Sequence, residues 1–301
     1  MTRWQADLTL GFVALIWGST FVIVQNALDE VAPLTFVAWR FALAAILLAA
    51  LFRHRVRGLT RAELRAGALI GMWLAGGYVF QTIGLQTTTT AKAGFITGLS
   101  VVIVPALATL LLRRPPGRGP ALGILAATVG LAFLSLERDL SMASGDLWVL
   151  ACALMFALHI VSVAHFAPQH DPIRLATVQI ATVAVLAGGA SFVFETPRAD
   201  LPAETWGAIA FTGLVATALV FSLQVYAQRF TTPTHTALLF SLEPVFAAFF
   251  GWWWANEVLG AKELVGCGLI LAGMIVAELG DGHAPEASAE GRASAQASEA
   301  L

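Results

Sequence analysis

Long apolar stretches separated by short polar breaks run along almost the whole chain. The clearest stretch, Thr236 to Asn256, is almost entirely apolar, and its length of about twenty residues is what a helix needs to cross the hydrocarbon core of a bilayer. The same criterion, moved along the sequence, predicts ten spans, at 8–27, 33–52, 65–85, 92–112, 120–136, 145–166, 172–194, 205–227, 235–255 and 263–279. The predicted fold class is therefore an all-α integral membrane protein.

The segments between these spans are short, and the end of the chain differs from the rest. The predicted loops leave no room for a soluble catalytic domain. Residues 281–301 are rich in Ala, Ser, Gly and Glu and contain no aromatic residue. Such a composition does not bury enough apolar surface to fold, so we expect a disordered cytoplasmic tail.

Composition supports the membrane assignment and narrows the classes of function. The chain is 58% hydrophobic and 12% charged, with a mean hydropathy of +0.78, whereas soluble domains carry about 25% charged residues. The basic residues are spread over short loops, so no nucleic-acid partner is expected. Cys152 and Cys267 both fall inside apolar spans, which is typical of buried thiols. We therefore expect no metal site and no cofactor.

The distribution of arginine predicts how the spans are oriented. If the N-terminus is cytoplasmic, the arginine-rich loops at 53–65 and 113–118 both lie on the cytoplasmic side. Positive residues in short loops favour that side. The prediction is a multi-pass protein of a bacterial-type cell inner membrane with both termini in the cytoplasm.

The two halves of the sequence repeat one another. Span 33–52 aligns with span 172–194 at an offset that pairs Arg40 with Gln179, and a similar offset pairs Gln81 with Gln224. A five-span unit reverses its orientation when it is repeated, as in many secondary transporters. We therefore expect two inverted five-helix repeats, residues 1–140 and 141–280, followed by the tail 281–301.

Four short motifs, in order, resemble one transporter family. They are WGSTF from Trp17, the Arg40-Phe41 pair, AGFITGLSVVIVP from Ala93 and SLEPVFAAFFGWWWANE from Ser241. Together they look like the EamA branch of the drug/metabolite transporter superfamily. The resemblance implies ten helices in two inverted repeats, and movement, usually export, of amino acids, other small metabolites or drugs.

Two charged residues inside the predicted spans are the first candidates for the substrate site. A carboxylate at the depth of Glu243 should face protein or water, because exposure to lipid costs at least about 2.5 kcal/mol. It could bind a proton or a substrate amino group, or it could pair with Arg40 or cap the backbone that Pro244 frees. Arg40 could receive a substrate carboxylate through a bidentate contact, or anchor the packing of the first repeat.

Polar and aromatic residues at matching spacings are the next candidates. Tyr78 and Gln81 lie one helical turn apart, and Phe221 and Gln224 repeat that spacing in the second half. These faces could line a common cavity, or they could form hydrogen bonds that hold the bundle together.

Three further residues complete the predicted substrate-binding set. Trp17 could stack on an aromatic substrate or pack in the core with its indole N–H satisfied. His159 could carry a proton or be a packed, hydrogen-bonded residue. Phe95 is a weaker candidate on span 92–112.

No nucleophile-and-base constellation lies within the spans, so we expect no enzyme. The predicted function is secondary transport, with export of amino acids or other small metabolites by alternating access. A non-coupled channel or facilitator and a non-transporting membrane scaffold are the alternatives. The expected partners are the small-molecule substrate and the lipid bilayer.

The sequence also bears on proton coupling and on the oligomeric state. Glu243 or His159 could couple transport to protons, although facilitated diffusion fits equally well. A homodimer could pack through small residues, namely Gly123, Gly130, Gly266 and Gly273.

Overall fold

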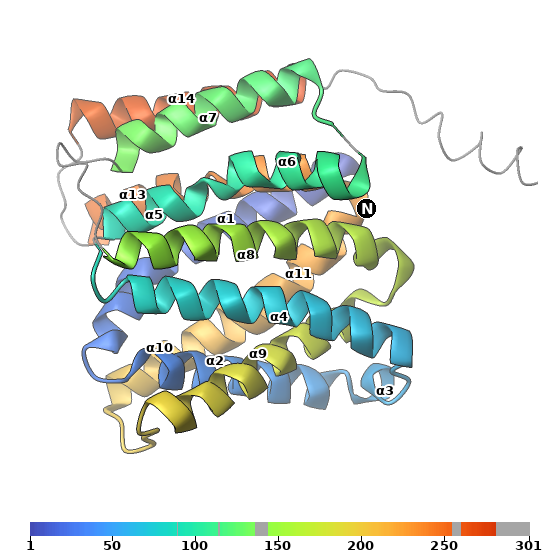
Figure 1. Cartoon of the computed structure of the whole chain (residues 1–301), viewed down its shortest axis with the longest axis vertical. Coiled ribbons are helices and arrows are strands. Elements are labelled where there is room, and N and C mark those ends of the chain that lie inside the picture. The colour runs from blue at the N-terminus through green and yellow to red at the C-terminus, as the bar shows by residue number, and fades with distance from the viewer. Residues whose placement is uncertain (89, 114, 136–143, 255–259, 281–301) are drawn as a thin grey trace, which may run out of the picture.

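The computed structural model describes residues 1–88, 90–113, 115–135, 144–254 and 260–280, and these residues form helices and turns without any strand (Figure 1). In chain order the helices are α1 (Arg3–Leu28), α2 (Pro33–Leu51), α3 (Arg53–Val56), α4 (Arg61–Gly84), α5 (Thr90–Gly98), α6 (Ser100–Leu112), α7 (Arg118–Ser135), α8 (Ser144–Phe166), η1 (Ala167–Gln169), α9 (Pro172–Phe194), α10 (Ala203–Gly213), η2 (Leu214–Leu219), α11 (Val220–Ala227), η3 (Gln228–Phe230), α12 (Pro233–Phe240), α13 (Glu243–Trp254) and α14 (Ala261–Gly280). The predicted disordered tail, 281–301, lies outside the described residues.

Six helical segments of the described chain are long and apolar enough to cross a membrane. They are Arg3–Leu28, Pro33–Leu51, Arg61–Gly84, Ser144–Gln169, Pro172–Phe194 and Ala203–Phe230. Two shorter apolar helices, Ile96–Leu112 and Arg118–Phe133, accompany them. The all-α membrane architecture expected from the hydropathy pattern is confirmed at this level.

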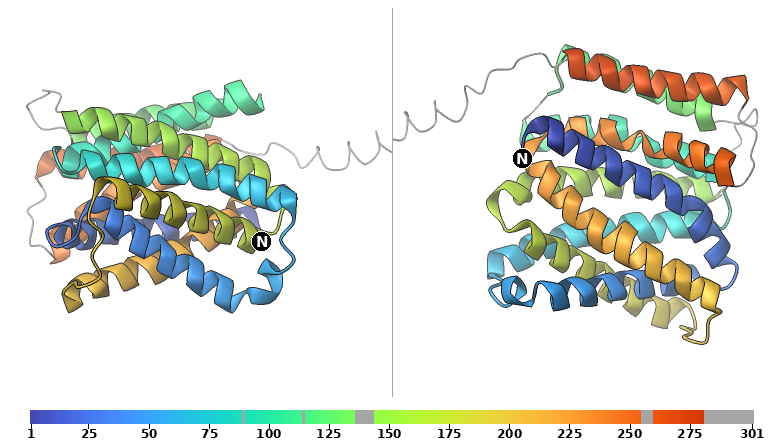
Figure 2. Two further views of the ribbon diagram at one scale, coloured as in Figure 1. Left: turned by 60° about the horizontal axis from the view of Figure 1, so that its bottom comes forward. Right: turned by 180° about the vertical axis from the view of Figure 1, so that it is seen from behind.

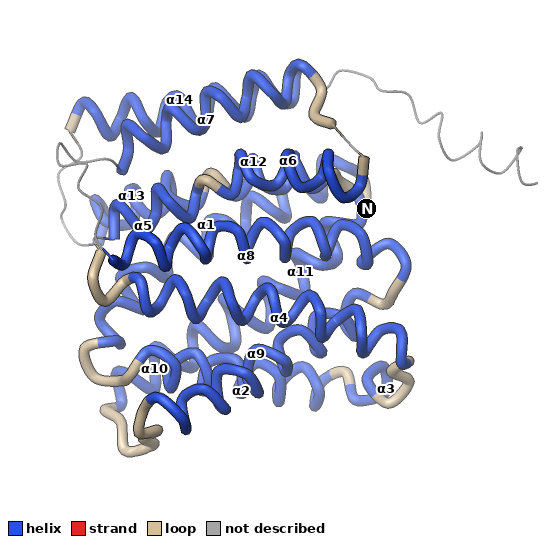
Figure 3. Tube along the Cα trace, in the orientation of Figure 1, coloured by secondary structure: helices blue, strands red, loops and turns tan. Residues whose placement is uncertain are grey.

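The helices lie side by side, and the turns collect at two opposite ends of the bundle (Figure 3). One end carries the N-terminus and α3, and we call it the N-terminal face (Figure 1). The other end carries the turns between α1 and α2 and between α9 and α10, and we call it the opposite face. These ends are where a membrane-embedded bundle meets water.

Three predicted spans are not continuous α-helices. The span predicted at 92–112 divides at Leu99 into α5 and α6, and the span predicted at 235–255 divides at Ser241 and Leu242 into α12 and α13. Pro244 is the second residue of α13, a position where the missing N–H has no intrahelical partner to lose. The third span, 205–227, changes from α10 to the π-helical η2 and then to α11.

Helix α9 packs against both α2 and α4, and a side-chain contact fastens it to each of them. At the opposite face the Glu195 carboxylate accepts hydrogen bonds from the backbone N–H groups of Leu34 and Thr35, both at 2.8 Å, and so caps α2. At the N-terminal face Arg174 of α9 donates to both carboxylate oxygens of Glu63 at 3.1 Å. These contacts hold α9 to α2 at the opposite face and to α4 at the N-terminal face.

The glycines that we considered for a dimer face are used inside the chain. Helices α7 and α14 pack along one another (Figure 2). A Cβ added at Gly123 would lie 2.5 Å from the carbonyl oxygen of Gly273, and one at Gly130 would lie 2.7 Å from that of Gly266. Only glycine allows this approach. The expected dimer face is therefore an internal helix contact.

Candidate functional site

The π-helical segment η2 creates an acceptor in the middle of the bundle. A π turn shifts the hydrogen-bond ladder and leaves carbonyl groups available to other donors. The Ala216 carbonyl accepts a hydrogen bond from Trp17 Nε1 at 3.0 Å and one from Arg40 Nη2 at 3.4 Å. Three segments far apart in sequence, α1, α2 and η2, therefore meet at one backbone oxygen.

Arg40 is buried, with 4% of its surface exposed. Its Nε donates to Thr217 Oγ1 at 2.7 Å, and its Nη2 donates to the Tyr78 hydroxyl at 3.4 Å. The guanidinium carbon also lies 5.0 Å from the centroid of the Tyr78 ring and 5.6 Å from that of Phe41, within the range of cation–π attraction. Arg40 thus joins α2 to η2 and α4, and its charge is held by neutral groups.

Phe221 is the centre of an aromatic wall beside Arg40. Its ring centroid lies 5.3 Å from Trp17, 6.2 Å from Phe41, 6.3 Å from Tyr78 and 5.9 Å from His159. These separations are typical of aromatic pairs that pack edge to face or tilted. The wall brings together three of the predicted site residues, Trp17, Tyr78 and His159.

Glu243 is the first residue of α13, directly after the break that follows α12. The N-terminus of a helix favours negative charge. Arg40, Tyr78 and Cys152 lie close enough to the Glu243 carboxylate to interact with it electrostatically. The hydrogen bonds of Arg40 described above go to other groups, so the structure does not use Glu243 as its direct partner.

Helix α1 approaches this carboxylate through Gly18 of the WGSTF motif. A Cβ added at Gly18 would lie 2.7 Å from Phe246 Cβ and 2.8 Å from the Glu243 carbonyl oxygen. A larger residue would push α1 away from α13. The motif therefore has a physical reason, which is close contact between a helix of the first half and the broken span of the second.

The two predicted glutamines do not form a matched pair. Gln81 Nε2 donates to Thr97 Oγ1 at 3.3 Å, which links α4 to α5. Gln224 is fully buried, and its Nε2 donates to Gln228 Oε1 at 3.1 Å. Gln228 in turn donates to the Ile160 carbonyl at 3.4 Å. Each glutamine therefore belongs to a different set of helices.

His159 and Phe95 complete the predicted set. His159 Nε2 lies 2.8 Å from Gln179 Oε1, a hydrogen bond that links α8 to α9. Both side chains are buried, with 2% and 0% of their surfaces exposed. Phe95 is part of α5, but its side chain lies outside the described part of the structure. Of the two roles considered for His159, the geometry matches a packed, hydrogen-bonded residue.

Sequence reasoning did not select Thr217, the Ala216 carbonyl or Gln179. Thr217 holds Arg40, and Gln179 holds His159. The repeat alignment paired Gln179 with Arg40, which indicated that Gln179 lies at the same depth in the second half as Arg40 does in the first. Nothing in the apolar stretch 214–219 indicates a π turn, so the Ala216 carbonyl had no signal at all.

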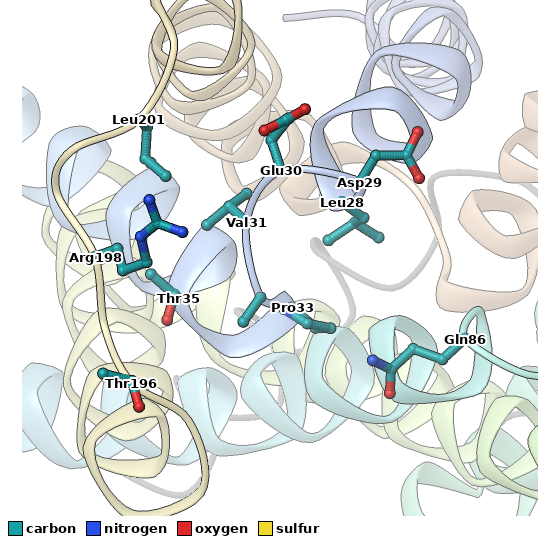
Figure 4. A pocket seen from close by; sticks show the side chains of 11 residues that line it. Leu28, Asp29, Glu30, Val31, Pro33, Thr35, Gln86, Thr196, Arg198 and Leu201 are labelled. Carbon is teal, nitrogen blue, oxygen red and sulfur yellow. The ribbon is translucent and has the colours of Figure 1, made fainter.

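A cavity of about 370 Å³ opens at the opposite face (Figure 4). It is lined by Asp29 and Glu30 beyond α1, by Gln86 beyond α4 and by Arg198 from the α9–α10 turn. Of the predicted site residues whose side chains are described, none lines this cavity. We call it the outer vestibule.

The charges of the outer vestibule are unequal. Arg198 donates to both carboxylate oxygens of Asp200 at 3.2 Å, and this contact holds the pKa of the Asp200 carboxyl below its usual range. Among the described residues that line the vestibule, Arg198 is the only cation and is already engaged, while Asp29 and Glu30 are exposed acids. The vestibule presents a net negative field to water.

Comparison with known proteins identifies the family. The model of the EamA-like transporter family matches the chain twice, over residues 4–136 and 143–278. This protein belongs to the EamA-like transporter family. An uncharacterized transporter of Archaeoglobus fulgidus is 34% identical over 92% of this chain and 87% of its own. The E. coli inner membrane transporter YedA, also uncharacterized, is 25% identical over 88% of each chain.

Two further comparisons extend this result. The WAT1-related protein At3g02690 of Arabidopsis thaliana, a chloroplastic protein, is 24% identical over 89% of this chain and 68% of its own. A solved crystal structure matches with a TM-score of 0.78 at 20% identity, over 92% of this chain and 98% of that one. The sequence-based resemblance is confirmed. The family consists of named transporters, in line with the expectation that the protein is not an enzyme.

Proposed function

We propose that this membrane transporter moves zwitterionic metabolites such as amino acids, and that it exports them by alternating access. The observation that carries the proposal is the placement of Arg40 and Glu243 within electrostatic range of one another beside an aromatic wall. A zwitterion would present its carboxylate to Arg40, which offers a planar fork of donors, and its ammonium group to Glu243. Trp17, Tyr78 and Phe221 would contact the side chain.

We further propose that the chain consists of two inverted repeats, residues 1–140 and 141–280, with ten spans in total. The two family matches support this division. Helix packing supports it as well, because α1 contacts α12 and α13 as α8 contacts α5 and α6, and α2 contacts α10 and η2 as α9 contacts α4. Two copies related by a twofold axis in the membrane would produce such reciprocal contacts.

The other predicted residues have supporting roles in this proposal. Gln81 of α4, held by its hydrogen bond to Thr97, would contact the substrate. Phe95 would contribute to the site from α5. Gln224 and His159 would set the spacing of α11, α8 and α9 around the site. Coupling to a proton stays part of the proposal and is taken up below.

The proposed location is the inner membrane with both termini in the cytoplasm. The name of the related E. coli protein supports the inner membrane, and the arginine-rich loops support the orientation. A homodimer would have to use a surface other than the α7–α14 contact. Light scattering of the purified protein in detergent measures the number of copies.

The test is uptake by proteoliposomes of radiolabelled amino acids, each compared with its methyl ester and its N-acetyl derivative. The ester lacks the carboxylate and the acetyl derivative lacks the ammonium group. We expect saturable uptake and trans-stimulation only for the complete zwitterion. Arg40→Lys should weaken discrimination against the ester, and Glu243→Gln discrimination against the acetyl derivative, while Glu204→Gln, an exposed acid on α10, should change neither.

The alternatives give different results in the same experiment. A channel would show uptake that neither saturates nor responds to substrate on the far side. A scaffold would show no uptake by protein that remains folded in the liposomes. Equal uptake of an amino acid and its two derivatives would contradict the roles given to Arg40 and Glu243.

A further inference from the structure

A second buried pair of titratable residues lies away from Arg40, at the N-terminal face. Asp7 Oδ1 of α1 lies 3.2 Å from His235 Nε2 of α12. The two residues have 8% and 5% of their surfaces exposed. Both helices begin at this face and pack against one another; in the rear view of Figure 2 they are dark blue and orange. The pair therefore joins the first half of the chain to the second.

Apolar residues of the same two helices adjoin this pair. Ala6 and Leu10 of α1 form a buried cluster with Leu239 of α12 and Ala227, and Phe230 and Met274 pack against this cluster. Asp7 Oδ2 makes no hydrogen bond within the described part of the chain. A buried carboxylate with an unsatisfied oxygen costs free energy unless a positive charge or water compensates it. The charge state of His235 therefore decides how stable this contact is.

Among the described side chains of the elements that pack against α1 and α12 at this face, there is no second acid. The titratable groups on the elements that pack against α1 and α12 here are Arg3, Arg113, Arg118, His165, Tyr226 and Arg229. The side chain of Glu278, near the end of α14, lies outside the described part. All but Tyr226 are basic side chains.

Helix α12 connects this pair to the proposed substrate site. His235 lies in its first turn, and the helix ends at Phe240, directly before the break that precedes Glu243. Glu243 is eight positions after His235, and the helical part from His235 to Phe240 rises about 7.5 Å at 1.5 Å per residue. A movement of α12 at the N-terminal face would therefore reach the break beside Glu243.

We propose that Asp7 and His235 form a proton-binding site whose occupancy controls opening of the N-terminal face. This inference rests on the proposed transport function. With a proton on His235, the imidazolium–carboxylate pair holds α1 against α12. When the proton leaves for water at the N-terminal face, a neutral imidazole and an uncompensated carboxylate remain. Water then hydrates Asp7, and the two helices separate.

The first test measures access to the seal around the pair. A Leu10→Cys variant, built in a Cys152→Ser, Cys267→Ser background, is labelled in nanodiscs with a membrane-impermeant maleimide. The rate is divided by that of an exposed reference, Trp4→Cys, at the same pH, which removes the pH dependence of the thiol chemistry. Between about pH 5 and about pH 8 we expect the ratio to rise, by at most about tenfold per pH unit for one linked proton.

Variants assign this response to the pair. Asp7→Asn and His235→Gln should each remove the pH dependence, so either one alone tests the site if the other fails to fold. Asp146→Asn changes another buried acid, at the opposite face, where Thr88 is its hydrogen-bond partner, and should leave the response unchanged. The proposal is overturned if the labelling ratio does not change with pH in the protein that retains Asp7 and His235. It is also overturned if the pH response survives both substitutions.

Transport separates this inference from the function on which it rests. With phenylalanine as the probe, Asp7→Asn should retain exchange across the membrane but lose accumulation driven by a pH gradient. If accumulation persists in Asp7→Asn, the proton site is wrong while the transporter stands. If no amino acid moves while labelling still follows Asp7, the proton site stands and the proposed substrate class is wrong.

Discussion

Helix α4 and the segment α10–η2–α11 occupy corresponding places in the proposed repeats, yet only the second is interrupted. Helix α4 runs without a break from Arg61 to Gly84, and its Leu74 is buried in the main apolar core. The alignment of the repeats places Thr217 opposite Leu74, and Thr217 sits in the π turn, where it holds Arg40.

In the proposed repeats, this difference would give the scaffold a single site. Two identical halves would present two identical faces to the centre of the bundle. The π turn converts one of two apolar packing positions into a polar anchor, and frees the Ala216 carbonyl for Trp17 and Arg40. Arg40 is thereby fixed toward one half, which would give the proposed substrate site a direction.

Replacement of Arg40 should give the largest effect, because Arg40 is the side chain that the π turn of η2 holds and that α4 has no counterpart for. Arg40→Met keeps an unbranched apolar stem and removes the guanidinium donors, each worth about 1.5–3 kcal/mol to a charged group, or roughly ten- to a hundredfold in affinity. We expect loss of measurable amino acid uptake and a lower unfolding temperature. The matched control is Gln179→Met, at the aligned position of α9. Equal losses in both variants would mean that α2 and α9 contribute equally to the site.

The close approach at Gly18 should give the next largest effect. Gly18→Ala places a Cβ within 2.8 Å of the Glu243 carbonyl oxygen, and overpacking of this kind costs about 1–3 kcal/mol. We expect uptake to fall strongly because α13 is displaced. Gly11→Ala on the same helix meets nothing within 4 Å and should leave uptake and thermal stability unchanged. Similar behaviour of the two variants would remove the special role of the WGSTF glycine.

Thr217→Val isolates the polar anchor itself. The substitution preserves shape but removes the acceptor of the 2.7 Å hydrogen bond from Arg40 Nε, at a cost of about 1–2 kcal/mol. The apparent affinity for the amino acid should fall more than the maximal rate. Thr212→Val, whose hydroxyl donates only to carbonyl groups of its own helix, is the control. If it has the same effect, the anchor is not specific to the π turn.

The contrast between these helices also shows what the sequence could predict. Apolar length and the positions of charged residues are local properties, so the all-α membrane class could be predicted from them, and Arg40 and Glu243 could be selected as candidates. The π turn depends on how α1 and α2 pack against 214–219, and that stretch resembles any other apolar helix. The partners of Gln81 and Gln224 likewise depend on tertiary contacts, because equal spacing within two helices does not fix what each faces.

Tyr78→Phe should have the smallest effect, because its hydroxyl contributes only the long 3.4 Å contact to Arg40. The ring and its cation–π contact at 5.0 Å remain, so we expect a change below about 1 kcal/mol in thermal stability. Tyr78→Leu removes the ring as well and should lower both stability and uptake clearly. If Tyr78→Phe alone abolishes uptake while the protein remains folded, the hydroxyl contacts the substrate directly. The aromatic side of α4 would then contribute as much polarity to the site as the π turn, and the asymmetry between the two helices would be smaller than the hydrogen bonds indicate.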